Sequence, residues 1–178
     1  MRDYFLTSSR LGFGHWQPDD LALLDSVFGD PVVTRYEGGD WSRQQIEDRL
    51  LFEISNFDRY HIQYWPVFLK DTGEYVGCCG VRPHDLAQGV LEFGCQLRRA
   101  FWSRQLGREA GEAVIAYAFK DKRVQALYAG HHPDNIASSE FLRHLGFAHT
   151  HDELYALTGL MEPCYLLTRS RFSEAALF

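Results

Sequence analysis

The 178-residue sequence lacks several features that define whole classes of protein. It contains no apolar run long enough to span a bilayer, and its first residues, 1–5, give no signal-peptide core. It also contains no repeat, no low-complexity tract and no linker rich in Pro, Gly or Ser. These absences predict a single cytoplasmic domain covering residues 1–178, which is large enough to bury a core without disulfides.

Cysteine is scarce, and no pair has the CxxC spacing of a redox or zinc motif. The cysteines are Cys78, Cys79, Cys95 and Cys164. We expect them to be small buried hydrophobes in a reducing compartment. No pair of histidines has convincing zinc spacing either, so no metal is expected.

Basic residues are fewer than acidic ones, so the formal net charge is −6. An acidic chain is poorly suited to non-specific nucleic-acid binding, so neither a nucleic acid nor a membrane is expected as a partner. Four arginines nevertheless fall within eleven positions: Arg98, Arg99, Arg104 and Arg108. One interpretation is a solvated helix face. The other is an anion site, because the run lies where a loop should enter a helix.

Periodicity and turn residues predict about seven strands and four helices. The helices are expected to begin near Pro18, Ser42, Leu106 and Asn135, and to end near Phe28, Asn56, Phe119 and Leu145. The expected strands cover residues 11–15, 64–69, 75–81, 91–97, 126–130, 147–154 and 164–168. Helices and strands do not alternate strictly in this order, which predicts a mixed α/β layered domain.

The segment 91–110 is the first one whose pattern indicates a ligand-binding site. A strand runs into a short loop, and the loop runs into a helix whose free backbone N–H groups and positive dipole end favour a pyrophosphate. The nearby arginines add charge-assisted hydrogen bonds. The signal is weak by spacing alone, because the loop is not glycine-rich.

Several motifs together resemble the GNAT superfamily of acetyltransferases, in its RimJ/RimL-like (ribosomal-protein-alanine-acetyltransferase-like) branch. The most specific is Asn135-Ile136-Ala137-Ser138 continuing to Leu145-Gly146-Phe147, which matches "N-x-x-S … LGF". The resemblance covers nearly the whole chain. The other matching segments are residues 6–11 ("L-T-x-R-L"), 17–20 with 29–32, 70–77 ("tG-x-x-iG") and 91–94 ("EIGY").

The resemblance implies a mixed, mostly antiparallel sheet of about seven strands, in which parallel strands 4 and 5, here 91–97 and 126–131, splay apart. The pantetheine arm of acetyl-CoA enters the gap and pairs with backbone groups of the first strand, and the pyrophosphate binds the loop amides. The residues that this implies for acetyl-CoA are Cys95, Gln96, Leu97, Arg104, Gln105, Leu106, Gly107, Arg108, Asn135 and Ser138.

The loop before the 106–119 helix departs from the family pattern "G-x-G-x-A/G". The corresponding positions are Ser103, Gln105 and Gly107, so two glycines are missing. Glycine lets a backbone approach a phosphate closely, and Gln105 places a side chain where the family has none.

Acetyl transfer to an amine needs a base, an acid and an oxyanion donor. Glu92 is the expected base, directly or through water, and its alternative is a surface carboxylate. Ser138 is the expected proton donor to the thiolate, and its alternative is a polar group bonded to the first helical turn. A backbone N–H of the 91–97 strand is expected to bind the oxyanion, and Tyr128 or Tyr165 remains an alternative group near the sulfur.

Aromatic residues are expected to line the acceptor pocket, namely Tyr36, Trp41, Tyr60 and Trp65, although core packing is an alternative for each. The predicted function is transfer of an acetyl group from acetyl-CoA to a primary amine of a protein N-terminus or small molecule, by a monomer or homodimer. The alternative is a degenerate acyl-CoA-binding module without turnover, which the loss of two loop glycines motivates.

Overall fold

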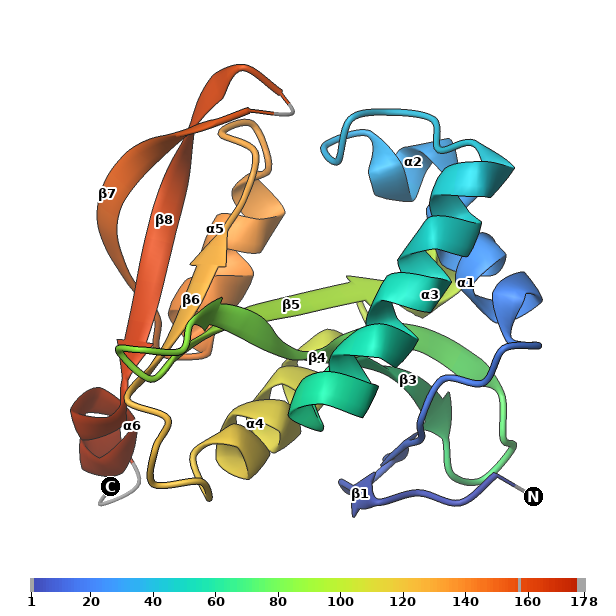
Figure 1. Cartoon of the computed structure of the whole chain (residues 1–178), viewed down its shortest axis with the longest axis horizontal. Coiled ribbons are helices and arrows are strands. Elements are labelled where there is room, and N and C mark those ends of the chain that lie inside the picture. Colours follow the sequence, from blue (N-terminus) through green and yellow to red (C-terminus); the bar gives the residue numbers. More distant parts are fainter. Residues whose placement is uncertain (1, 157, 176–178) are drawn as a thin grey trace.

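A computed structural model describes residues 2–156 and 158–175, and its centre is one eight-stranded sheet in the order β1-β2-β3-β4-β5-β6-β8-β7 (Figure 1). Among the strands of the described residues, only the β5–β6 pair is parallel, which confirms the predicted mixed, mostly antiparallel sheet. The strands are β1 (Leu6–Thr7), β2 (Leu11–Phe13), β3 (Tyr64–Leu69), β4 (Tyr75–Asp85), β5 (Val90–Leu97), β6 (Ala126–Gly130), β7 (Ala148–Tyr155) and β8 (Leu160–Thr168).

The sheet of the described residues has eight strands where about seven were expected, and the additional strand is β1. This strand has only two residues, too few for any alternation of apolar and polar side chains to be visible in the sequence. Its partner decides its structure, because Leu6 pairs with Phe13 and Thr7 with Gly12 of β2.

The four predicted helices are present, and two further helices and a 3₁₀ turn were not predicted. The elements are α1 (Leu21–Phe28), α2 (Pro31–Thr34), α3 (Arg43–Tyr60), the 3₁₀ turn η1 (Arg99–Phe101), α4 (Leu106–Ala118), α5 (Ile136–His144) and α6 (Arg169–Ala175). The capping box predicted at Ser42 is confirmed, because Ser42 Oγ accepts from Gln45 N–H and Gln45 Oε1 accepts from Ser42 N–H. The helix runs past the expected Asn56 to Tyr60 and ends at His61, whose φ is 59°.

Two apolar clusters, one on each face of the sheet, form the core. Alternate β3 residues face opposite ways, so Trp65 packs in the cluster that includes α4, while Tyr64 packs in the cluster that includes α1 and α3. Helices therefore cover both faces (Figure 1). Within residues 2–156 and 158–175, no helix combines the length and apolarity that a bilayer-spanning segment needs.

Strands β5 and β6 begin side by side and then diverge, as Figure 1 shows. They pair only from Val90 with Ala126 to Glu92 with Tyr128. Beyond Glu92, β5 stays paired with β4 as far as Leu97, while β6 stays paired with β8 as far as Gly130. A fork therefore opens in the sheet just after Glu92.

Candidate active site

The β5 edge beyond the fork has backbone groups available for a ligand. Arg98 N–H donates to Val76 O (2.9 Å), and antiparallel partners alternate between bonded and non-bonded pairs. The even residues of β5 therefore direct their backbone groups toward β4. The odd residues Phe93, Cys95 and Leu97 direct theirs toward the fork, where no pairing with β6 is present in the described chain.

A cavity of about 400 Å³ extends from this fork across the face of the sheet that α3 covers. Its lining brings together most of the predicted catalytic, donor-site and aromatic residues: Tyr36, Trp41, Glu92, Cys95, Gln96, Asn135 and Ser138. Segments as distant as the loop after α2 and the β7–β8 hairpin also contribute to it. The predicted residues that do not line it are Tyr60, Trp65, Leu97 and residues 104–108.

Trp65 does not lie in this cavity, so its assignment to the acceptor pocket is wrong. Its side chain is fully buried on the opposite face of the sheet, against Phe5 and the edge of Tyr117. The neighbouring residue Tyr64 occupies the cavity wall instead. A shift of one position along a strand exchanges the two faces, and the sequence of β3 is apolar on both.

Glu92 lies at the fork and is held by Tyr64, a residue that sequence analysis did not select. Tyr64 Oη donates to Glu92 Oε1 at 2.6 Å. Burial raises the pKa of Tyr64 well above its usual value, and the Glu92 charge raises it further, so the phenol keeps its proton and acts as a donor. Gly94 makes this contact possible, because a Cβ at that position would overlap the Tyr64 ring.

A second carboxylate, Glu37, faces the same cavity from the loop after α2. Burial raises its pKa, and the positive charge of Arg49 and a hydrogen bond from Gln96 Nε2 (3.4 Å) only partly oppose this. Trp41 Nε1 donates to Glu37 O at 3.0 Å and so fixes the loop. The only sequence signal at Glu37 was its place beside the Gly38-Gly39 turn.

Two arginines also reach the cavity, and one buried carboxylate positions both. Glu53 is 1% exposed and accepts from Arg49 Nε (2.9 Å), from an Arg82 guanidinium N–H and from Tyr64 N–H (2.9 Å). The Arg82 guanidinium also lies 3.8 Å from the centre of the Tyr64 ring. Glu53 is unavailable to a ligand, because its oxygens are already occupied.

The α5 start presents Asn135 and Ser138 to the cavity. Asn135 Oδ1 accepts from Ser138 N–H at 3.2 Å, so Asn135 is the cap of this helix. Ser138 Oγ has no partner among the described hydrogen bonds. Of the two tyrosines considered as alternatives, Tyr128 lines the cavity, whereas Tyr165 is buried and bonded to Ser139 Oγ at 2.8 Å.

The loop before α4 keeps the conformation that glycines would favour. Ser103 and Gln105 have φ of 57° and 60°, and Gln105 is the N-cap of α4 without a side-chain cap bond. The first helical bond runs from Glu109 N–H to Gln105 O (3.1 Å). The N–H groups of residues 106–108 precede it and have no acceptor within the described chain.

A larger groove of about 750 Å³ lies elsewhere, between the ends of α3 and α4. It is lined by residues such as Leu86, Tyr117 and Arg123. Of the predicted site residues it contains only Tyr60, which does not line the smaller cavity. We assign the site to the smaller cavity, because the open strand edge and the buried carboxylates meet there.

Comparison with known proteins agrees with this geometry. The family model "Acetyltransferase (GNAT) domain" matches residues 10–148. YkkB of Bacillus subtilis strain 168 is 29% identical over 129 residues, which cover 72% of this chain and 75% of YkkB. The N-acetyltransferase p20 of Bacillus licheniformis is 26% identical over 144 residues, which cover 80% of this chain and 81% of p20.

Among solved structures, RimL, an alpha-N-protein acetyltransferase of ribosomal L7/L12 solved in complex with coenzyme A, shares the fold. The TM-score is 0.78 at 13% identity, covering 93% of this chain and 98% of RimL. The chain therefore belongs to the GNAT acetyltransferase family. It is an N-acetyltransferase, and RimL, which belongs to the branch that the sequence motifs resemble, has the same fold.

Proposed function

We propose that the whole chain, residues 1–178, acts as one domain that transfers an acetyl group from acetyl-CoA to a primary amine bound in the 400 Å³ cavity. The observation that carries this proposal is the fork after Glu92. It gives an unpaired strand edge for the donor and, at the same point, a carboxylate for the acceptor. Residues 1, 157 and 176–178 lie outside the described structure.

Two sets of free backbone groups fit the donor acetyl-CoA. The Cys95 and Leu97 edge, with Gln96 between them, suits an amide-containing pantetheine arm, and the unpaired N–H groups of residues 106–108 suit a pyrophosphate. Arg104 and Arg108 are exposed at the same loop, where their charges favour an anion. Acetyl-CoA supplies the activated thioester, and no metal is needed for that chemistry.

In this proposal, one cavity residue accepts a proton from the acceptor amine and another donates a proton to the leaving thiolate. Glu92 accepts the proton that the ammonium form of the acceptor must lose, and Tyr64 positions Glu92 for it. Ser138 donates a proton toward the departing sulfur. The outward N–H groups of β5 stabilise the oxyanion.

The acceptor is a cationic amine. Three carboxylates line its part of the cavity, Glu37, Glu92 and Glu162, beside aromatic rings that include Trp41 and Tyr155. Such walls attract an ammonium group by charge and by its interaction with ring faces. Both a protein N-terminus and a small amine satisfy this description.

Thermal unfolding with acetyl-CoA and with CoA tests the donor site. A ligand at a hundred times its Kd stabilises the folded state by about 2.7 kcal/mol, so the melting temperature should rise with ligand concentration. AMP, which lacks the pantetheine arm, should produce a much smaller rise. An unchanged melting temperature at millimolar acetyl-CoA would contradict the proposed donor site.

Release of CoA with a panel of amines tests turnover. Glu92→Gln should lower kcat by about a hundredfold and Ser138→Ala by about tenfold, whereas Glu47→Gln, on the exposed side of α3, should leave it unchanged. Unaltered activity in both cavity variants would contradict the assigned roles. Binding of acetyl-CoA without turnover of any amine would favour an acyl-CoA-binding module, which the missing loop glycines also motivate.

A further inference from the structure

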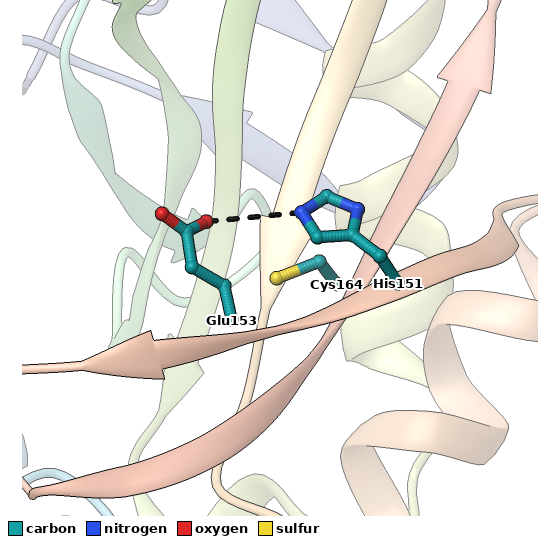
Figure 2. A group of neighbouring side chains, drawn as sticks. All are labelled: His151, Glu153 and Cys164. Carbon is teal, nitrogen blue, oxygen red and sulfur yellow. Dashed lines mark ion pairs between the residues drawn. The ribbon is translucent and has the colours of Figure 1, made fainter.

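Three side chains outside the proposed catalytic set converge on the β7–β8 ribbon. His151 and Glu153 are two positions apart on β7 and therefore share a face. Cys164 is the β8 partner of His151. Figure 2 shows the imidazole and the carboxylate directed toward each other with the sulfur between them, and one possible ligand atom from each residue lies within 4.8 Å of the other two.

The hydrogen bonds around His151 determine which ring nitrogen is free. Thr150 Oγ1 donates its proton to Cys164 O (3.1 Å), so it can only accept from His151 Nδ1, which lies 3.0 Å away. Nδ1 therefore carries the proton of the neutral ring. Nε2 is left with a lone pair, facing Glu153 Oε2 at 3.9 Å. This is the tautomer and the type of supporting contact that metal-binding histidines use.

The cluster is thus short of positive charge at its centre. An imidazole lone pair and a carboxylate face each other beside the Cys164 sulfur, an arrangement that a cation or another bridging donor between them stabilises. Cys164 is buried and fixed, with Tyr128 Oη 3.1 Å from its sulfur. The other two side chains are 56% and 63% exposed and are free to close on an ion.

We propose that His151 Nε2, Glu153 and Cys164 Sγ form a binding site for Zn²⁺ or a similar borderline-soft divalent cation. Imidazole and thiolate exclude Mg²⁺ and Ca²⁺ as preferred ions. Tetrahedral zinc with ordinary bond lengths holds such atoms about 3.3–3.6 Å apart, a contraction that two exposed side chains can make. Three protein ligands leave a fourth position for water.

The site borders the acetyl-transfer cavity through Tyr128. Its hydroxyl contacts Cys164, and its residue lines the cavity. Burial raises the pKa of the Cys164 thiol, so a bound cation would displace its proton to solvent, bind the thiolate sulfur and so fix the β7–β8 ribbon beside the cavity. This departs from the metal-free expectation, which rested on spacing within the sequence. Here the ligands meet through strand pairing.

Titration of the metal-depleted, reduced protein with Co²⁺ tests the site. We expect one equivalent to bind, with the visible bands of tetrahedral cobalt and a near-ultraviolet thiolate-to-cobalt charge-transfer band, and Zn²⁺ to displace it. Cys164→Ala should abolish the charge-transfer band. His151→Ala and Glu153→Gln should each weaken Co²⁺ binding by about tenfold or more.

His149→Ala is the matched control, because a register shift between His149 and His151 separates His149 from the cluster and its ring packs on Tyr165. It should bind Co²⁺ as the unmodified protein does. Absence of stoichiometric binding, or binding unchanged by Cys164→Ala, would overturn the proposal. If Cys164→Ala fails to fold, the two exposed variants decide the question, and unchanged affinity in both overturns the site.

Discussion

At the scale of single residues, Glu37 is a loop residue whose pKa is changed by the groups around it in the folded protein. It lies on a short segment between α2 and α3, and Trp41 Nε1 and Gln96 Nε2 hold it against the cavity. Burial raises the pKa of its carboxyl because the charged form loses water. Arg49 and Arg82 lower it by a smaller amount.

The raised pKa of Glu37 should make the free energy of unfolding depend on pH, and Glu37→Gln tests this dependence. A carboxyl whose folded pKa is raised stabilises the fold below its ordinary pKa of 4.5, and that contribution is lost as pH rises through the raised value. The unmodified protein should therefore lose stability relative to Glu37→Gln across this window, by about 1.4 kcal/mol for each unit of pKa shift. Urea unfolding at a series of pH values measures the difference. Parallel curves for the two proteins would contradict it.

The residues around Glu92 show which parts of the candidate site could be predicted from the sequence and which could not. Glu92 was predicted as the base because its strand motif resembles the family. Tyr64, which positions it, lies 28 residues away and was visible only as one of several aromatic residues. Trp65 was predicted to line the acceptor pocket, because nothing in a strand that is apolar at every position distinguishes one face from the other.

At the scale of elements, the segment from η1 to α4 is the feature of this chain that departs most clearly from its family. Ser103 and Gln105 adopt the left-handed conformation, which costs an L-residue other than glycine roughly 1–2 kcal/mol. The loop nevertheless keeps its shape. Arg10 Nη1 donates to Arg104 O (3.2 Å), and Glu109 of α4 accepts from Arg10 Nε (2.6 Å).

Restoring the glycines should therefore stabilise the protein. Ser103→Gly and Gln105→Gly should each raise the free energy of unfolding by up to about 1 kcal/mol, after the greater unfolded-state entropy of glycine is subtracted. Ser103→Ala and Gln105→Ala are the controls, because alanine keeps the strain and should give no gain. Thermal and urea unfolding measure all four variants. Equal stability of the Gly and Ala variants would show that the loop carries no such strain.

Elements with local signals were predictable, and elements made by tertiary contact were not. The caps at Ser42 and Asn135 fixed the starts of α3 and α5, because each uses a side chain close in sequence. Strand β1 and helix α6 have no comparable signal. Thus β1 forms by pairing with β2, and α6 is anchored by Arg169, whose Nε donates to Val124 O at 2.8 Å.

At the scale of the whole molecule, Glu53 joins three elements around the cavity. It belongs to α3, accepts from the backbone of β3 at Tyr64 and binds the guanidinium of Arg82 on β4. Arg49, one turn earlier on α3, binds the same carboxylate. The wall of the 400 Å³ cavity is therefore supported by one buried charge with two partners.

Glu53→Gln should consequently destabilise the whole fold by about 3–5 kcal/mol, because it leaves two buried guanidinium groups without their counter-ion. Glu47→Gln, which alters an exposed pair with Arg43 on the same helix, should cost less than about 1 kcal/mol. Urea unfolding compares them. Adding Arg82→Met to Glu53→Gln should recover part of the loss, because it removes one of the unpaired charges. If the double variant is no more stable than Glu53→Gln, the cost comes from packing at Glu53 and not from its charge.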